Sequence, residues 1–325
     1  MDGRQDILVV IDPTAAEQPA LQRGLQLSRA LDTGLELFIC QHDARLAGRR
    51  LFAAAEREAM RRAQMEHQLG YLRSLARELG DAAPPVALKV VWDAPLSEGI
   101  VRETLRSEPR LVLKDTHQHT SLARALFSHT DWQLIRDCPA PLWLVKSGAL
   151  QRPVILAAVD PMHEYAKPAA LDELILDEAE RLAGLLDGEL HVYHGYDPTP
   201  EIARAGAFAM APAPLPLDEI AQRVATAHRE AFEQLLEGRA LPDARRHLLP
   251  GNPVERLPAL ARQLGAGLVV MGAVARGRLK HATVGSTAER VLDHLPCDVL
   301  VLKPPGFESP VFYHPQARDF MQISG

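Results

Sequence analysis

The most constraining feature of this sequence is that its second half repeats its first. Residues 111–146 align with residues 268–303 at a constant offset of 157 without a gap, and both segments run from an apolar stretch through a polar loop to a helical pattern. Only seven positions are identical, so the shared apolar pattern carries more weight than the identities. ILVVIDP at residues 7–13 likewise matches VILAAVDP at residues 154–161. The chain is therefore a tandem duplication.

Each half alternates short runs rich in Val, Ile and Leu with longer segments of helical period. Strands are expected near residues 6–12, 34–40, 86–92, 110–114 and 142–146, and again near 153–159, 188–194, 244–249, 267–271 and 298–302. Helices are expected near residues 17–31, 50–79, 95–106 and 130–137, and again near 169–186, 216–238, 253–264 and 286–294. Near-continuous apolar strands indicate a parallel sheet covered on both faces. The fold class predicted is α/β, with two tandem Rossmann-like domains, each a five-stranded doubly wound parallel sheet.

The length and composition of the chain indicate how many domains it forms and which functions are excluded. A chain of 325 residues with 47% hydrophobic residues is long enough for two cores, and we predict domains at residues 1–149 and 150–304 followed by a tail at 305–325 that packs against one of them. A net charge of −6 argues against direct nucleic-acid binding. Three widely spaced cysteines do not form a disulfide framework, and no apolar run is long enough to span a membrane. We expect a cytoplasmic protein.

The stretch VVMGAVARGRLKHATVGSTAERVLDHLPCDVLVLKP, which begins at Val269, contains the components of an anion site. Gly272 ends a strand and carries no β-carbon that would keep a phosphate away. Gly285, Ser286 and Thr287 offer backbone N–H groups and two hydroxyls at the start of a helix. With Ala275 these residues give the spacing G-x2-A-x9-G-S. A helix cap is the competing interpretation, because S-x-x-E from Ser286 is also a capping box.

This spacing resembles the nucleotide loop of the universal stress protein family, which reads G-x2-G-x9-G-[S/T], and the resemblance covers nearly the whole chain once per half. LVVIDP, KVVW, TDW, CPAP and STAERVLDHLPCDVLVLKP together resemble the tandem, E-type members of the family. The resemblance implies an adenine nucleotide alpha hydrolase-like fold with strand order 3-2-1-4-5 and a role in survival under stress. It also implies that the fifth strands pair, so that the halves form an intramolecular pseudo-dimer with pseudo-twofold symmetry. Whether whole chains also form a homodimer is left open by the sequence.

Carried over residue by residue, the resemblance gives the second half an ATP site. The positions that match are Asp160 and Val192 for the adenine, Met271 and Gly272 for the loop start, Ala275 within the loop, and Gly285, Ser286 and Thr287 for the phosphates. Ala275 departs from the family, which has glycine there. If this position requires a positive φ, alanine costs about 1 kcal/mol and its methyl group crowds the phosphates.

The first half has lost the corresponding loop. Asp115, Gln118 and Ser128 stand where Gly272, Ala275 and Gly285 stand in the second half, and a carboxylate at Asp115 would repel phosphates.

The motif DTHQH offers a metal site from Asp115, His117 and His119 as an alternative role for this loop. Hydrogen-bonded surface histidines are the competing interpretation, and no resident metal is predicted.

These observations predict a regulatory module that binds a small molecule, not an enzyme, since no catalytic set of residues is evident. ATP in the second half is one ligand hypothesis. The alternative is a scaffold that holds an apolar molecule or a partner protein, with the Pro- and Ala-rich segment 206–219 as a flap over the ligand.

Overall fold

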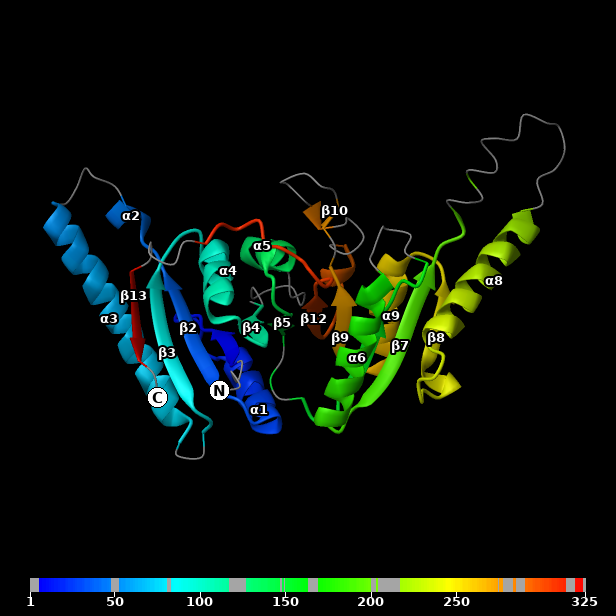
Figure 1. The fold of residues 1–325 in the computed structure, drawn as a ribbon, viewed down its shortest axis with the longest axis horizontal. Helices are drawn as coiled ribbons and strands as arrows, with labels where there is room; N and C mark the ends of the chain where they lie inside the picture. The colour runs from blue at the N-terminus through cyan, green and yellow to red at the C-terminus, as the bar shows by residue number, and fades with distance from the viewer. Residues whose placement is uncertain are drawn as a thin grey trace. The chain divides into compact units, whose positions relative to one another are not determined.

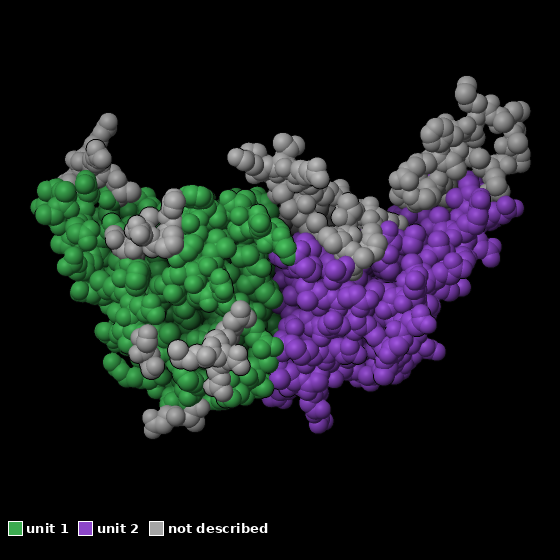
Figure 2. All heavy atoms as spheres, in the orientation of Figure 1, with its two compact units in different colours: residues 1–150, 306–325 green, residues 151–305 purple. Residues whose placement is uncertain are grey.

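The chain divides into two compact units, coloured in Figure 2. Unit 1 comprises residues 1–150 and 306–325, and unit 2 comprises residues 151–305. The structure is a computed structural model that describes residues 6–47, 53–80, 83–116, 127–146, 148, 150–162, 169–199, 203, 217–273, 275–276, 283–284, 290–313 and 319–323. Within those ranges, no helix has both the length and the apolar character needed to cross a membrane.

The sheet of unit 1 contains five parallel strands in the order β3-β2-β1-β4-β5 (Figure 1). The strands are β1 (Ile7–Val10), β2 (Leu35–Gln41), β3 (Val86–Trp92), β4 (Leu111–Asp115) and β5 (Leu142–Val145). In the central strand, Ile7 lies opposite Leu35 on one side and Leu111 on the other. Ile7, Leu8 and Val9 are fully buried, as expected for a strand with helices on both faces.

The helices of unit 1 lie between its strands in the chain. They are α1 (Pro19–Leu31), α2 (Ala44–Ala47), α3 (Ala54–Glu78), α4 (Leu96–Ser107) and α5 (His129–Asp137). Helix α5 begins with a capping box, in which Asp131 N donates to Ser128 Oγ (3.2 Å) and Ser128 N donates to Asp131 Oδ2 (2.8 Å). The sequence therefore fixes where this helix starts.

Unit 2 repeats this sheet in the order β8-β7-β6-β9-β12. Its strands are β6 (Val154–Ala158), β7 (Glu189–Tyr196), β8 (Arg246–Pro250), β9 (Ala266–Gly272) and β12 (Asp298–Leu302). Its helical elements include α6 (Ala169–Leu185), α8 (Leu217–Leu235), the 3-10 turn η1 (Asp243–Arg245) and α9 (Pro253–Leu264). Ile155 lies opposite Leu190 and Leu268, just as Ile7 lies opposite Leu35 and Leu111. The registers therefore confirm the predicted α/β fold and match Leu111 to Leu268.

A small hairpin, which the sequence did not predict, follows β9 in the chain. Strand β10 (Ala275–Arg276) pairs antiparallel with β11 (Thr283–Val284), and Ala275 lies opposite Val284. Ala275 therefore has an extended backbone, which alanine adopts without strain. The condition under which alanine would be strained, a positive φ, is therefore not met at this position.

The end of the chain adds a sixth strand to unit 1, where five were expected. Strand β13 (Asp319–Ile323) pairs antiparallel with β3, with Phe320 opposite Val91. Before it, Ser309 Oγ donates to the Asp137 carbonyl (2.7 Å) and Arg102 Nε donates to the Phe312 carbonyl (3.2 Å). The tail thus packs against unit 1. The twofold relation between the halves and the pairing of their fifth strands stay predictions.

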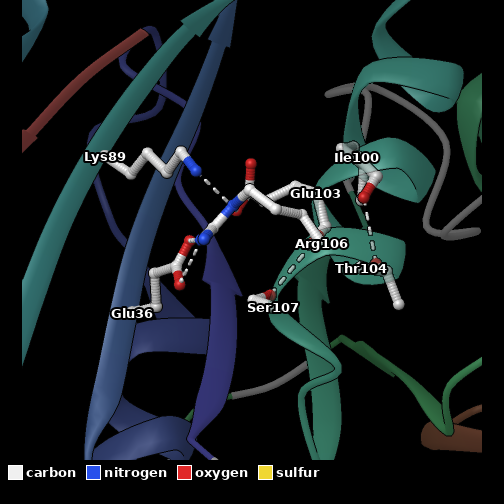
Figure 3. A network of polar contacts seen from close by, with 7 residues as sticks. All are labelled: Glu36, Lys89, Ile100, Glu103, Thr104, Arg106 and Ser107. Atoms are coloured by element: carbon white, nitrogen blue, oxygen red, sulfur yellow. Dashed lines mark hydrogen bonds and ion pairs between the residues drawn. The ribbon is translucent and has the colours of Figure 1, made fainter. Parts of the chain in front are cut away.

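A buried charge network joins α4 to two strands of unit 1 (Figure 3). Lys89 Nζ lies 3.0 Å from Glu103 Oε1, and both side chains are almost completely buried. Arg106 Nε donates to the same carboxylate, and its Nη2 lies 3.3 Å from Glu36 Oε2. Burial and the nearby Glu103 raise the pKa of Glu36 to about 7, against the opposing effects of Arg106 and Lys89. Burial lowers the pKa of Lys89, against the opposing effect of Glu103.

Candidate ligand-binding site

The carboxyl ends of β6 and β9 bring three of the predicted residues together. Met271 lies opposite Ala158, the last residue of β6, and Gly272 ends β9. Asp160 lies two residues beyond Ala158, just past the end of β6, and is therefore close to Met271 and Gly272. In an open α/β sheet this edge, between the first and fourth strands, is where ligands bind.

Helix α6 holds the backbone at Asp160 in place. The backbone N–H of Asp160 donates to Asp172 Oδ1 at 3.0 Å. Asp172 lies in the first turn of α6 and is fully buried. A buried carboxylate that accepts a backbone N–H forms a charge-assisted hydrogen bond. This bond holds the turn after β6 in a fixed position at the edge of the site.

Val192 is not close to the level of Asp160. It lies opposite Ala157, three residues before Asp160, and is only 1% exposed. Counting along the ladder from the pair Ala158 and Tyr193, the residue of β7 at the level of Asp160 is Gly195. The structure therefore places Val192 inside the sheet and Gly195 at its edge.

Gly195 makes room for a buried tyrosine. A β-carbon at Gly195 would lie 2.0 Å from the Tyr193 hydroxyl oxygen, so this position cannot carry a side chain while Tyr193 keeps its place. Tyr193 is 3% exposed, and burial raises the pKa of its hydroxyl although Arg256 acts in the opposite direction. This hydroxyl stays protonated at any physiological pH.

Two histidines beneath Asp160 were missed by the sequence analysis. His194 Nδ1 lies 3.2 Å from the Val159 carbonyl, which can only accept, so Nδ1 carries the proton and Nε2 accepts. His228 Nδ1 then donates to His194 Nε2 at 2.8 Å. Both rings are almost fully buried, and Tyr196 stacks on His228 at 4.8 Å. This chain of hydrogen bonds supports the peptide that directly precedes Asp160.

The predicted phosphate-binding end of the site lies outside the described residues. This applies to Gly285, Ser286 and Thr287, and with them to the choice between a phosphate cradle and a helix cap. Ala275, in β10, is the loop position whose backbone is described.

Unit 1 carries a carboxylate where unit 2 has Gly272. Asp115 ends β4 as Gly272 ends β9, and its Oδ1 accepts the backbone N–H of Ala20 at 2.7 Å. The carboxylate therefore occupies the amino end of α1, where an anionic ligand would otherwise find donors. Lys114 Nζ lies 2.8 Å from Asp131 Oδ1 and donates to the Asp115 carbonyl at 2.9 Å.

The histidines of the alternative metal hypothesis, His117 and His119, lie outside the described residues. Where the chain is described, no three side chains of His, Cys, Asp or Glu gather closely enough to hold a metal ion. The third residue of that hypothesis, Asp115, contacts the start of α1 as described above.

Comparisons with known proteins agree on both halves. The model of the universal stress protein family matches residues 3–146 and 153–303. Universal stress protein E of Escherichia coli K12 is 34% identical over 320 residues, which cover 94% of this chain and 96% of that protein. The protein of the same name from Photorhabdus laumondii is 29% identical, with 96% and 98% covered.

Two solved structures resemble the whole chain. A functionally unknown protein from Pseudomonas aeruginosa PAO1 has a TM-score of 0.71 and 28% identity, and 93% of each chain is covered. A universal stress protein from Archaeoglobus fulgidus has a TM-score of 0.60 and 15% identity, covers 93% of this chain and 99% of its own, and supports the fold alone.

Proposed function

Because the chain belongs to the universal stress protein family, and resembles universal stress protein E across both halves, its role is related to stress, and we propose that it acts as a regulatory binding module. We propose further that unit 2 holds an adenine nucleotide at the carboxyl ends of β6 and β9. Asp160, Met271, Gly272 and the edge of β7 at Gly195 would contact the base side, and Gly285, Ser286 and Thr287 would contact the phosphates.

The observation that carries this proposal is the difference between Asp115 and Gly272. The strand registers place the two residues at the same position in the two sheets. In unit 1 the carboxylate fills the amino end of a helix, which excludes phosphate by charge and by occupying the donor. In unit 2 glycine places neither charge nor side chain there. Nucleotide binding by unit 2 alone, at no more than one per chain, follows from this asymmetry.

The extended backbone of Ala275 also favours the proposal. The departure from the family's glycine counted against ATP mainly because it threatened backbone strain, and a residue in a strand has none. What remains is the extra methyl group, which is a smaller obstacle.

Calorimetric titration of the full chain with ATP tests the proposal. Gly272→Val should weaken binding at least about 100-fold, because a branched side chain would occupy the space that the phosphates need. Gly184→Val is the matched control, since Gly184 is exposed on α6 and a β-carbon there meets no neighbour. Ala275→Gly should tighten binding by removing the methyl group.

A parent chain that releases no heat with ATP, together with an equally silent Ala275→Gly, would refute nucleotide binding. The scaffold hypothesis would then be favoured, although its flap, residues 206–219, lies almost wholly outside the described residues. Native mass spectrometry of the purified chain distinguishes the two, because it weighs any nucleotide or apolar molecule that stays bound.

A further inference from the structure

A tyrosine hydroxyl occupies the place of a side chain at the carboxyl edge of unit 2. Alternate residues of a strand share a face, so Tyr193 and Gly195 of β7 point to the same side of the sheet. The Tyr193 side chain extends along the strand until its hydroxyl fills the space that a β-carbon at Gly195 would take. Because Gly195 lies at the level of Asp160, β7 presents this hydroxyl at the edge where the nucleotide is proposed to bind.

The hydroxyl has a hydrogen-bonding capacity that the described chain does not use. Tyr193 is almost completely buried, and among the described residues its hydroxyl oxygen has no hydrogen-bond partner. Buried tyrosine hydroxyls usually have a partner, because burial without one costs free energy. A ligand that supplies the partner would recover this free energy on binding.

Unit 1 indicates that the fold does not need this hydroxyl. The strand registers match Phe38 to Tyr193, and Phe38 is fully buried. Two residues further along, Cys40 stands where unit 2 has Gly195. The buried ring is therefore common to both halves. The hydroxyl, and the glycine that makes room for it, belong to the half that is proposed to bind a nucleotide.

The surroundings of the hydroxyl favour an acceptor as its partner. Burial raises the pKa of Tyr193, so the hydroxyl keeps its proton and can donate it. The guanidinium group of Arg256 in α9 opposes this shift in pKa, which means that it favours negative charge at the hydroxyl oxygen. Arg256 Nε lies 2.8 Å from the place of a β-carbon at Gly251, which follows β8. A positive group on this side favours an electron-rich partner, such as a ring nitrogen of a purine.

We propose that the Tyr193 hydroxyl donates a hydrogen bond to a ring nitrogen of the adenine base and so determines part of the base specificity of unit 2. This inference rests on the proposed nucleotide binding and names the group of β7 that recognises the base. A site that hydrogen-bonds its ligand discriminates against an analogue without the bonded atom, because the buried group is then left without a partner. Unit 2 therefore selects bases that have an acceptor at this position.

Calorimetric titration of the full chain with ATP tests the inference. Tyr193→Phe, which introduces the residue that unit 1 has at this position, should weaken binding at least about tenfold. Tyr71→Phe is the matched control, because it removes a hydroxyl from α3 of unit 1 and should leave binding unchanged. Hydrogen exchange of β7 without ligand should show Tyr193→Phe to be at least as stable as the parent, since no hydrogen bond of the described chain is lost.

Nucleotide analogues identify the bonded atom. In 1-deaza-ATP, 3-deaza-ATP and 7-deaza-ATP a C–H group replaces one ring nitrogen. The analogue that lacks the bonded nitrogen should bind the parent at least about tenfold more weakly than ATP. The same analogue should bind Tyr193→Phe as tightly as ATP does, because the two changes remove one and the same hydrogen bond.

The outcomes distinguish this inference from the one on which it rests. A parent chain that releases no heat with ATP refutes nucleotide binding and this inference with it. Equal binding of ATP by the parent and Tyr193→Phe, or binding of all three analogues to the parent as tightly as ATP, overturns the role of Tyr193 and leaves nucleotide binding intact. A loss of stability in ligand-free Tyr193→Phe also overturns it, because the hydroxyl would then have its partner within the chain.

Discussion

Unit 1 and unit 2 have different polar side chains at matching positions of their sheets. The registers match Glu36 to His191 and Lys89 to His247. In unit 1 Lys89 and Glu103 form a buried ion pair that Arg106 extends to Glu36. In unit 2 the His191 and His247 rings stack at 5.2 Å, with Nδ1 and Nε2 2.8 Å apart.

The comparison shows that the fold does not dictate its internal polar groups. Both sheets keep the same register although one site contains a buried ion pair and the other contains two imidazoles, of which His191 also contacts the partly exposed Glu189 at 3.1 Å. A buried ion pair contributes little net stability, because desolvation offsets the attraction, but the loss of one partner is costly. Unit 1 should therefore be the half that tolerates single substitutions poorly and responds to pH through a carboxylate.

The chain offers a direct way to follow one half. Its three tryptophans, Trp92, Trp132 and Trp143, all lie in unit 1. Tryptophan fluorescence therefore reports the unfolding of unit 1, and hydrogen exchange of peptides from β7 and β8 reports unit 2.

The largest effect is expected from Lys89→Met. It removes one of the two cations, Lys89 and Arg106, that the described residues place against the fully buried Glu103, and should lower the free energy of unfolding of unit 1 by about 3 kcal/mol. His247→Met at the matched position removes a single hydrogen bond between rings and should cost unit 2 about 1 kcal/mol. Urea unfolding followed by fluorescence and by hydrogen exchange measures both. Equal costs would contradict the distinction between the two sites.

A second difference is the edge of each sheet. Strand β13 covers β3, whereas no described strand lies beyond β8. Phe320 of β13 places its ring 4.8 Å from Lys89 Nζ, and α3 also contacts β13. A chain that is truncated after Pro305 would have five strands in unit 1, the same number that the described part of unit 2 has.

That truncation should lower the free energy of unfolding of unit 1 by about 2 kcal/mol, because it removes a strand ladder and exposes apolar surface of β3. Hydrogen exchange in β7 and β8 should stay unchanged, which serves as the internal control. If the urea midpoint measured by fluorescence equals that of the full chain, β13 does not contribute to the stability of unit 1.

The repeated pattern predicted the sheets but not these additions. Each parallel strand has its own apolar run, and the offset between the halves predicted the match of Leu111 to Leu268 that the registers show. DFMQI at residues 319–323 is a single short run after a proline-containing segment, and nothing in it identifies β3 as its partner. Local pattern specifies an element, whereas pairing across the chain depends on tertiary contacts.

The candidate site shows the same limit. Asp160, Met271 and Gly272 were predictable because each lies within two residues of the carboxyl end of a strand, and these ends meet at one edge of the sheet. Val192 lies in the strand ELHVYHGY, whose pattern predicts a strand but does not show which of its residues lies at the level of Asp160. His194 and His228 are 34 residues apart, and their contact depends on how α8 rotates against β7, which periodicity does not specify.

The most distinctive effect concerns the dependence of stability on pH. Glu36 has a pKa raised from 4.5 to about 7, so between these values native unit 1 binds more protons than the unfolded chain. Its stability should therefore be highest below about pH 4.5 as far as Glu36 is concerned, and fall as the pH rises to about 7. Burial and the nearby His191 lower the pKa of His247 from 6.5. The unfolded chain then binds more protons, so the stability of unit 2 should rise with pH through about 6.5.

The matched positions therefore predict opposite slopes of stability against pH, which urea titrations between about pH 5 and about pH 8 can resolve. Glu36→Gln should remove the slope of unit 1 and raise its stability near pH 8 by about 2 kcal/mol, since the buried group no longer has to ionise. Glu98→Gln, at a partly exposed carboxylate of α4 that is paired with Arg102, should leave the slope in place. Slopes of the same sign in both units would mean that Glu36 ionises normally and that its charge is fully compensated by Arg106 and Lys89. The ion network would then be a balanced set of four charges, and the chemical difference between the halves would have no consequence for their response to pH.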